Sequence, residues 1–358
     1  MLFVTPPLSR KVLADLRELD ARRAELGAQV GVARPWSGAL RRQVRAATAE
    51  SSIAIEGFQV PTGLAGGILD GQQVPVVGEQ DAAALAAYAR AMDHVAAMAE
   101  DPRFAWGERV ILDLHFDTCH FQPDARPGRY REGPILVTSP EGGAPAYVAP
   151  PADEVPALVE EFVRWLSGEA DEAHVVVRAA MAHLHLVSIH PFRDGNGRTS
   201  RIVQSLALAR DGLVAPEFGS IEEYLARHTP AYYAALRKVQ GGSYQPARDA
   251  GPWVRFCIAA HLEQVNQRLD QLADAGRRWT RLEELVAERA WPERLVIALE
   301  QCLFGGTDRA SYAAEADTSA ATASTDFRRL LDAGLVEQRG KGPATRYTAS
   351  PALRTLVS

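Results

Sequence analysis

The stretch from His190 to Arg201, HPFRDGNGRTSR, contains the side chains of this sequence best suited to bind a phosphate group. Gly195 and Gly197 permit backbone angles that residues with a Cβ avoid, and they let backbone N–H groups face outward where a helix begins. Such N–H groups, together with the dipole of the helix, form a site for an anion. The sequence therefore predicts a phosphate-binding turn between an incoming apolar helix and an outgoing amphipathic one.

Four further side chains in this turn fit the same chemistry. Arg198 and Arg201 are three residues apart on the outgoing helix and hence share a face, where two guanidinium groups suit a polyphosphate. Asp194 offers a carboxylate oxygen, the type of ligand that Mg²⁺ prefers beside phosphates. His190 is the one side chain of the turn able to accept a proton near neutral pH. A base, a metal ligand and a phosphate cradle together indicate transfer of a phosphorus-containing group to a hydroxyl.

The alternative is a helix–turn–helix whose charged turn is incidental. A lone His or a lone pair of glycines would favour that reading. Eight residues of the right kind within twelve positions favour the chemical one.

The turn resembles the Fic motif, HxFx(D/E)GNGRxxR, at every position, and the resemblance extends over about residues 40 to 260. It implies an all-α core and a protein adenylyltransferase, which moves AMP from ATP to a Ser, Thr or Tyr hydroxyl of a protein. It further implies that His190 deprotonates the hydroxyl, that Asp194 holds Mg²⁺ and that Phe192 is buried and structural. The residues that it assigns to the phosphates of ATP are Gly195, Asn196, Gly197, Arg198 and Arg201, the last of which pairs with the γ-phosphate.

A second segment, Ser52 to Gly57 (SIAIEG), resembles the inhibitory motif of the same family, (S/T)xxxE(G/N). The resemblance implies that Glu56, helped by Ser52, pairs with Arg201 and occupies the γ-phosphate site. A carboxylate competes with a phosphate for the same guanidinium fork, so the pair would inhibit the enzyme. The alternative is an ordinary surface Glu at a helix end.

Two further resemblances concern the target and the nucleotide. The residues Gly128, Arg129, Tyr130 and Arg131, with the β-type runs after them, resemble the family's flap, which aligns the target protein by strand addition. A plain surface hairpin is the alternative. Tyr232 and Tyr233 match a position that contacts adenosine in the family, and we expect one of the two to face the nucleotide, although aromatic pairs on helices more often belong to a core.

The elements that must position these residues are mostly helical. We expect a β-hairpin from two short runs, Pro134–Thr138 and Ala146–Val148, with Gly142-Gly143 between them. We expect a helix over Pro252–Gln271 and a charged connecting segment over Arg281–Trp291. The remaining predicted helices cover 9–26, 40–55, 81–99, 107–121, 155–166, 173–189, 197–210, 221–228 and 230–239.

The C-terminal pattern is helix, helix, helix and two short strands, which resembles a winged helix–turn–helix. The helices are expected over Pro292–Phe304, Arg309–Ala316 and from Thr318 or Ser319 to Ala333. From residue 292 onward the chain carries eight Lys and Arg and eight Asp and Glu, whereas a DNA reader normally presents a basic face. DNA binding and protein contact, including a homodimer, therefore both stay open.

Composition limits the class of protein. The chain has 358 residues, 47% of them hydrophobic, a formal net charge of -6 and a pI near 5.9. Its mildly acidic balance gives no overall attraction to nucleic acid or to an anionic membrane. Three scattered cysteines suggest buried free thiols in a reducing compartment, and with no signal peptide or membrane span in the sequence we expect a cytoplasmic protein. The abundance of Ala and Arg is typical of a bacterium with a GC-rich genome.

These observations predict a mainly α fold with a Fic-type helical core, a β-hairpin flap and a small winged-helix domain. The expected parts are N-terminal helices over 1–105 with an inhibitory helix at about 40–57, a catalytic core over 106–275 with the flap at about 128–150, and the winged helix over 290–358. ATP is the expected substrate, Mg²⁺ the cofactor and a hydroxyl-bearing protein, which includes this chain itself, the partner. The alternatives are removal of AMP at the same site and a nucleotide-sensing regulator that binds DNA.

Overall fold

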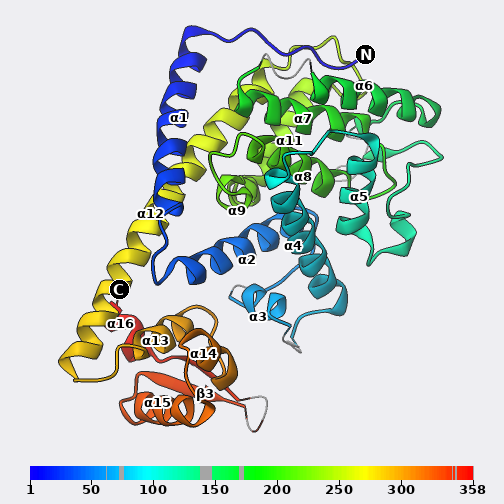
Figure 1. The fold of residues 1–358 in the computed structure, drawn as a ribbon. Coiled ribbons are helices and arrows are strands. Elements are labelled where there is room, and N and C mark those ends of the chain that lie inside the picture. The colour runs from blue at the N-terminus through cyan, green and yellow to red at the C-terminus, as the bar shows by residue number, and fades with distance from the viewer. Residues whose placement is uncertain are drawn as a thin grey trace. The chain divides into compact units, whose positions relative to one another are not determined.

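The fold was analysed in a computed structural model that describes residues 1–61, 63–71, 76–137, 147–168, 173–340, 342 and 345–357. The chain divides into two compact units (Figure 1). The first comprises residues 1–30, 47–60 and 75–267, and the second comprises residues 31–46, 61–74 and 268–358. Helices α2 (Ser37–Ile55) and α12 (Gly251–Glu288) each contribute to both units. The prediction of a mainly helical chain is confirmed.

Helix α7 (Val175–Ile189) forms the centre of the first unit. Every residue from Val176 to Ile189 except Arg178 is buried, as expected for a helix that is apolar on all sides. Helix α8 (Asn196–Ala209) follows after a six-residue turn and is also almost wholly buried. The turn between them is therefore fixed by two helices that cannot move without opening the core.

The other helices of the first unit surround this pair. They are α1 (Arg10–Val30), α4 (Glu79–Glu100), α5 (Glu108–Cys119), α6 (Val155–Ser167), α9 (Pro216–Gly219), α10 (Glu222–Arg227) and α11 (Thr229–Gln240), with the short 3₁₀ turns η1 (Pro123–Ala125) and η2 (Ala152–Glu154). The three cysteines of the chain are buried and free, as their spacing predicts.

A short antiparallel hairpin projects from the first unit. Strand β1 (Leu136–Val137) pairs with β2 (Tyr147–Val148), with Leu136 opposite Val148. The predicted hairpin is thus present at its base. The predicted turn at Gly142-Gly143 lies outside the described residues.

Helix α12 is much longer than the sequence suggests. It continues through the segment predicted as a charged connection and ends at Glu288. The prediction of a helix end near Gln271 was wrong because buried residues continue at helical spacing beyond it, among them Leu272, Trp279 and Leu282. Charged residues between them, such as Asp274 and Arg277, are exposed.

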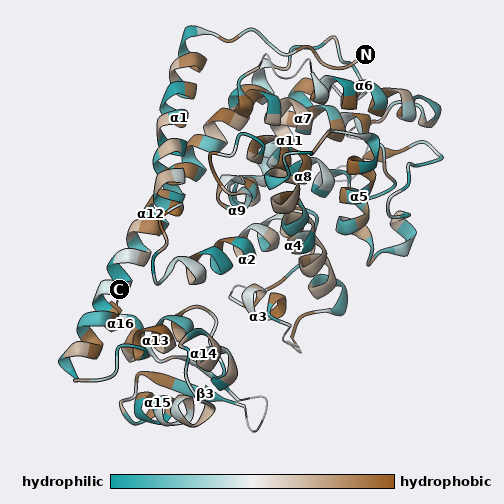
Figure 2. Cartoon of the chain, in the orientation of Figure 1, coloured by the Kyte–Doolittle hydropathy of each residue, from teal (hydrophilic) through white to brown (hydrophobic). Residues whose placement is uncertain are grey.

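The second unit contains the C-terminal elements and two earlier pieces. Its helices are α13 (Leu295–Leu303), α14 (Arg309–Glu315), α15 (Ala320–Asp332) and α16 (Pro351–Val357), together with α3 (Ala65–Leu69) and the first half of α2. Strands β3 (Val336–Arg339) and β4 (Arg346–Ala349) form an antiparallel hairpin. In Figure 2 hydrophobic residues gather on α13, and the rings of Phe327 and Tyr347 stack at 3.8 Å in the same core.

The three predicted C-terminal helices and the hairpin are present in the expected order. Asp308 begins α14 by accepting bonds from two backbone N–H groups, and Ser319 begins α15 by accepting one, from the N–H of Thr322. Within the described ranges, no helix combines the length and the hydrophobicity needed to cross a membrane.

Candidate active site

His190 ends α7 in a left-handed conformation, with φ 52°, and so places its ring at the start of the turn. Its Nδ1 lies 3.0 Å from the carbonyl oxygen of Val187. A carbonyl only accepts, so Nδ1 carries the hydrogen and Nε2 keeps a lone pair. Burial lowers the pKa of His190, a shift that the Val187 bond partly opposes. The ring is therefore neutral at pH 7 and able to take a proton at Nε2.

Asn196 closes the turn with its side chain. Its Oδ1 accepts from the N–H of Phe192 at 2.9 Å, and its Nδ2 donates to the carbonyl of Phe192 at 2.8 Å. Each polar end of the amide thereby makes one bond to the backbone of Phe192, and Nδ2 keeps a second N–H. Phe192 is wholly buried, as the resemblance implies.

The two glycines of the turn leave room that a larger residue would fill. Gly195 has φ 76°, and a Cβ there would lie 2.2 Å from the sulfur of Cys119. A Cβ on Gly197 would lie 2.4 Å from Oε1 of Glu56. The surface of Gly197 is thus already in contact with a carboxylate oxygen, which occupies the position of an anion at the start of α8.

Arg201 and Glu56 form the ion pair that the sequence predicts. Nη2 of Arg201 lies 2.9 Å from Oε1 of Glu56, and its Nε donates to Oγ of Ser52 at 2.8 Å. Burial opposes the charge of Arg201, but Glu56 together with Tyr232 and Tyr88 outweighs it, so the pKa of Arg201 is raised. Nη1 of Arg201 is buried and has no hydrogen-bond partner among the described residues. The guanidinium therefore retains a donor for a further anion.

Arg198, on the same helix as Arg201, lies close to two aromatic rings from other parts of the chain. Its guanidinium carbon is 5.3 Å from the ring centre of Phe58 and 5.8 Å from that of Phe121. Its Nη2 donates to Oε1 of Gln122 at 2.9 Å, whereas its buried Nε has no partner in the described part of the chain. Two buried guanidinium groups with a spare donor each fit a polyphosphate.

Asp194 has a half-exposed side chain whose Oδ1 accepts from the N–H of Gly195 and lies 3.7 Å from Nη2 of Arg198. The described residues contain no cluster of three or more His, Cys, Asp or Glu side chains that could hold a metal. A single carboxylate nevertheless fits Mg²⁺, which usually keeps several waters and takes its other ligands from the phosphates.

The four flap residues predicted from the sequence have different roles in the structure. Arg131 is buried, and its guanidinium donates to the carbonyl oxygens of His190, Gly133 and Pro150. Arg131 thus fastens the base of the flap to the turn. Arg129 is exposed, Tyr130 is partly exposed and packs against Phe192, and Gly128 adopts φ 71°.

Tyr232 and Tyr233 also differ in burial and in their hydrogen-bond partners. Tyr232 is buried, and its hydroxyl lies 3.1 Å from Nε2 of His183. Nδ1 of His183 bonds to Oε1 of Gln204, so the ring is held inside the core and burial lowers its pKa to about 3. Tyr233 is half-buried, and its hydroxyl donates to the carbonyl oxygen of Ile55 at 3.3 Å. Tyr233 is therefore the member of the pair that can face a nucleotide.

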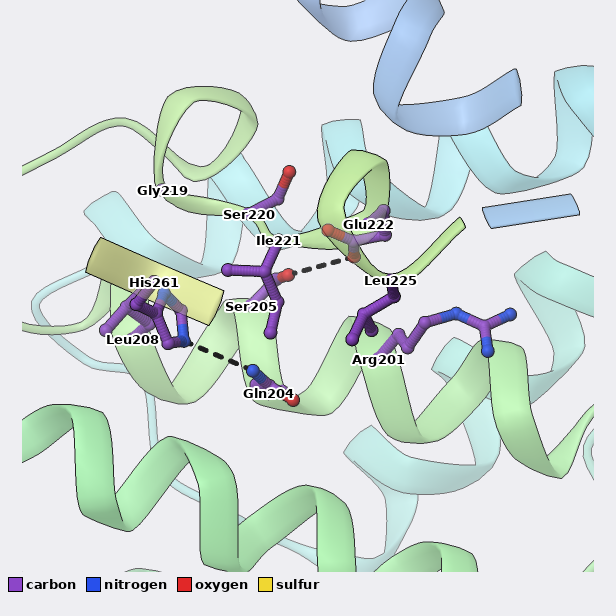
Figure 3. Close-up of a pocket in the computed structure, with 10 residues that line it drawn as sticks. All are labelled: Arg201, Gln204, Ser205, Leu208, Gly219, Ser220, Ile221, Glu222, Leu225 and His261. Carbon is purple, nitrogen blue, oxygen red and sulfur yellow. Dashed lines mark hydrogen bonds between the residues drawn. The ribbon is translucent and has the colours of Figure 1, made fainter. Parts of the chain in front are cut away.

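A small pocket lies beside Arg201, between α8 and the segment that leads into α10 (Figure 3). Its lining includes Gln204, Ser205, Glu222 and His261. Figure 3 shows the Arg201 guanidinium extending away from these residues, while Gln204 bonds to His261 and Ser205 to Glu222. Apart from Arg201, no described residue that lines this pocket belongs to the stretch from His190 to Arg201.

His115 is a site residue that the sequence did not reveal. It lies on α5, is wholly buried and bonds to the carbonyl oxygen of Asp194 and to the N–H of Gly128. Burial lowers its pKa to about 4. Its partners are 79 and 13 residues away, so no local spacing could have marked it.

Comparisons with known proteins agree with this geometry. Residues 106–208 match the family model described as the Fic/DOC family. Two relatives, each described as "Protein adenylyltransferase Fic", come from Drosophila ananassae and Drosophila melanogaster. Each is 33% identical over 150 residues, which are 41% of this chain and 26% of the relative. The match thus spans about a quarter of the length of these curated relatives.

Two solved structures share the fold. A Fic family protein from Desulfovibrio desulfuricans G20 aligns with a TM-score of 0.60 at 21% identity, over 96% of this chain and 97% of that one. Fic-1 from C. elegans aligns with a TM-score of 0.57 at 23% identity, over 73% of each chain.

Proposed function

We propose that this chain, which carries a Fic domain over residues 106–208, is a protein adenylyltransferase. It moves AMP from ATP to a Ser, Thr or Tyr hydroxyl of a target protein, which can be a second copy of the chain or the chain itself. The proposal rests on one observation above the others: His190 presents a neutral Nε2 at a glycine turn that Arg198 and Arg201 flank with unpaired donors.

In the proposed reaction the target hydroxyl oxygen attacks the α-phosphorus of ATP. The bond between the α-phosphorus and the bridging oxygen of pyrophosphate breaks, and the hydroxyl proton passes to Nε2 of His190. Backbone N–H groups at Gly195–Gly197 and the guanidinium groups of Arg198 and Arg201 stabilise the phosphate charge. Positioning and charge stabilisation supply most of the acceleration in such transfers.

Asp194 is the residue that would hold Mg²⁺, which would neutralise phosphate charge as pyrophosphate leaves. The half-exposed carboxylate beside Gly195 fits this role. The target segment would add to the β1–β2 hairpin as a strand, in which backbone pairing gives alignment with little sequence preference. Tyr233 would contact the adenosine.

The proposed enzyme is inhibited by its own Glu56. The carboxylate of Glu56 binds the guanidinium of Arg201 and lies against Gly197. It thereby fills the position that the γ-phosphate would otherwise take. Release of Glu56 would open this position to ATP in the productive pose.

The test is the intact mass of wild type, Glu56→Gly and His190→Ala after incubation with ATP and Mg²⁺. We expect a gain of one AMP in Glu56→Gly, a small gain in wild type and none in His190→Ala. Absence of any gain in all three would contradict the transfer. Release of AMP from a pre-modified protein by wild type, lost in Glu56→Gly, would instead indicate AMP removal at the same site.

For the C-terminal elements, we propose a winged helix–turn–helix over about residues 290–358, after N-terminal helices (1–105) and the catalytic core (106–275). The order α13, α14, α15 and the β3–β4 hairpin support this assignment. Its balanced charge favours protein contact, such as a homodimer, over DNA. A mobility shift of DNA that weakens steeply with salt would favour the DNA-binding regulator instead.

A further inference from the structure

The ring of His115 connects two parts of the site that are far apart in the sequence. Its Nδ1 lies 3.0 Å from the backbone nitrogen of Gly128, the first residue of the flap. Its Nε2 lies 3.0 Å from the backbone oxygen of Asp194 in the turn. Both contacts are made by a side chain that is wholly buried.

These two partners fix the position of the ring hydrogen. The N–H of Gly128 only donates, so Nδ1 of His115 must offer its lone pair. The carbonyl of Asp194 only accepts, so Nε2 must carry the hydrogen. The neutral Nε2–H ring is therefore the form that satisfies both bonds, and each ring nitrogen is used once.

The face and edge of the same ring contact the turn as well. The ring stacks on Phe192 with centroids 3.7 Å apart and planes 4° apart. A Cβ on Gly195 would lie 3.5 Å from its Nε2. The position of this one ring thus sets the distance between the flap's first residue and three residues of the turn.

We propose that His115 is a positioning residue that holds the flap and the carboxylate-bearing part of the turn in one geometry. The proposal rests on the transfer function proposed above, because the flap would place the target hydroxyl and Asp194 would place the metal and the phosphates. Alignment of the hydroxyl with the α-phosphorus would then depend on a ring that contacts neither substrate. A displacement of about 1 Å at such a point can reduce a rate a hundredfold.

Two substitutions separate the two halves of the link. The amide of Asn reaches the place of Nδ1, so His115→Asn keeps an acceptor for Gly128 and loses the donor to Asp194. The amide of Gln reaches the place of Nε2, so His115→Gln keeps the donor to Asp194 and loses the acceptor for Gly128. Both are compared in a Glu56→Gly background, with His94→Asn and His94→Gln as matched controls. His94 lies on α4, is partly exposed and bonds to Asp117 of α5, the helix that carries His115.

The proposed role of His115 predicts a different loss for each of the two variants. His115→Asn should weaken the binding of ATP with Mg²⁺, measured by calorimetry, about five- to tenfold, the loss expected from one hydrogen bond. His115→Gln should bind ATP with Mg²⁺ as tightly as its parent but transfer AMP to itself about tenfold more slowly at saturating ATP. The His94 variants should change neither quantity.

Equal losses in both variants, or unchanged values in both, would overturn the proposal, since a purely structural ring would not divide the two effects. If Glu56→Gly binds ATP but transfers nothing, the transfer function fails while the calorimetric difference still decides the link to Asp194. If either variant does not fold, ring ¹⁵N shifts of the intact wild type at pH 7 decide the geometry. The Nε2–H tautomer is expected for His115, and the Nδ1–H tautomer or a protonated ring would refute the link.

Discussion

At the scale of single residues, the glycines of the turn show how closely the site is packed. Gly195 combines a left-handed backbone with a Cβ direction that points at Cys119, so substitution meets both strain and a clash. Gly212 offers the matched comparison, because it has φ 69° and no atom within 4 Å of its Cβ position.

We expect Gly195→Ala to lower stability by roughly 3 kcal/mol or more, against about 1 kcal/mol for Gly212→Ala, which meets the backbone strain alone. Thermal unfolding would show this as a Tm lower by roughly 6 °C or more in the first variant and by about 2–4 °C in the second. Equal shifts in the two variants would mean that Cys119 moves aside at no cost.

His190 as the proposed base predicts how the transfer rate depends on pH, and the direction follows from the surroundings of its ring. Burial lowers the pKa of His190 below its ordinary value, and the charge of Glu56 partly opposes that shift. Removal of Glu56 should therefore lower the pKa further. Because the base acts when neutral, the transfer rate of Glu56→Gly should stay level from pH 8 down to about 6.5, the ordinary value for His, and fall only below it.

The pH–rate profile at saturating ATP measures this limb directly. An acid limb centred at pH 7 or above would exclude His190 as the group that titrates, or would place its ring in water. His190→Ala at the same pH values gives the background rate.

At the scale of elements, the proposed inhibitory segment depends on the contacts that hold α2. Ser52 accepts from Nε of Arg201, and Thr48, one turn earlier, lies 3.2 Å from the hydroxyl of Ser220. Both contacts are buried, and both lie in the first unit with Glu56. Arg201 is thus bound both by the carboxylate of Glu56 and by the hydroxyl of Ser52, which lies one turn earlier on α2.

We expect Ser52→Ala to release part of the inhibition. Loss of a hydrogen bond to a charged group weakens the closed state by about 1.5–3 kcal/mol, so self-modification should rise about tenfold or more over wild type. The rise should stay below that of Glu56→Gly, which removes the carboxylate itself. Ser51→Ala, a half-buried neighbour on the same helix, is the control, and a Ser52→Ala rate equal to wild type would assign the grip to Glu56 alone.

The elements also show which parts of the site could be predicted from the sequence. The turn from His190 to Arg201 was identifiable because its chemistry is contiguous and begins a helix. The pairing of Glu56 with Arg201 was predicted by resemblance, across 145 residues, and the structure contains it. Periodicity also placed most helices, because a buried stripe leaves a local pattern.

The remaining features depend on contacts that no local pattern records. His115 was assigned no role because its bonds to Gly128 and Asp194 form only when α5 packs beside α8. Neighbouring tyrosines point in different directions on a helix, so the sequence could not tell that Tyr232 enters the core while Tyr233 stays near the surface. The length of α12 was underestimated because its charged face masked the buried one.

At the scale of the whole molecule, the proposed ATP site and the C-terminal elements belong to different units. Every residue proposed to contact ATP lies in the first unit, whereas α13 to α16 lie in the second. A ligand that binds one folded unit stabilises that unit by RT ln(1 + [L]/Kd), which is about 2.7 kcal/mol at a hundredfold excess over Kd.

We therefore expect two unfolding transitions, of which ATP with Mg²⁺ raises only one. Hydrogen exchange in low denaturant, followed by mass spectrometry on the Glu56→Gly variant, assigns each transition to its peptides. Peptides of α7 and α8 should gain protection with ATP, while peptides of α14 and α15 should not. Helices α2 and α12 provide the sharpest measure, because each contributes residues to both units and should gain protection on the first-unit side alone. If protection rises equally throughout the chain, the two units unfold as one, and the prediction of two transitions is wrong.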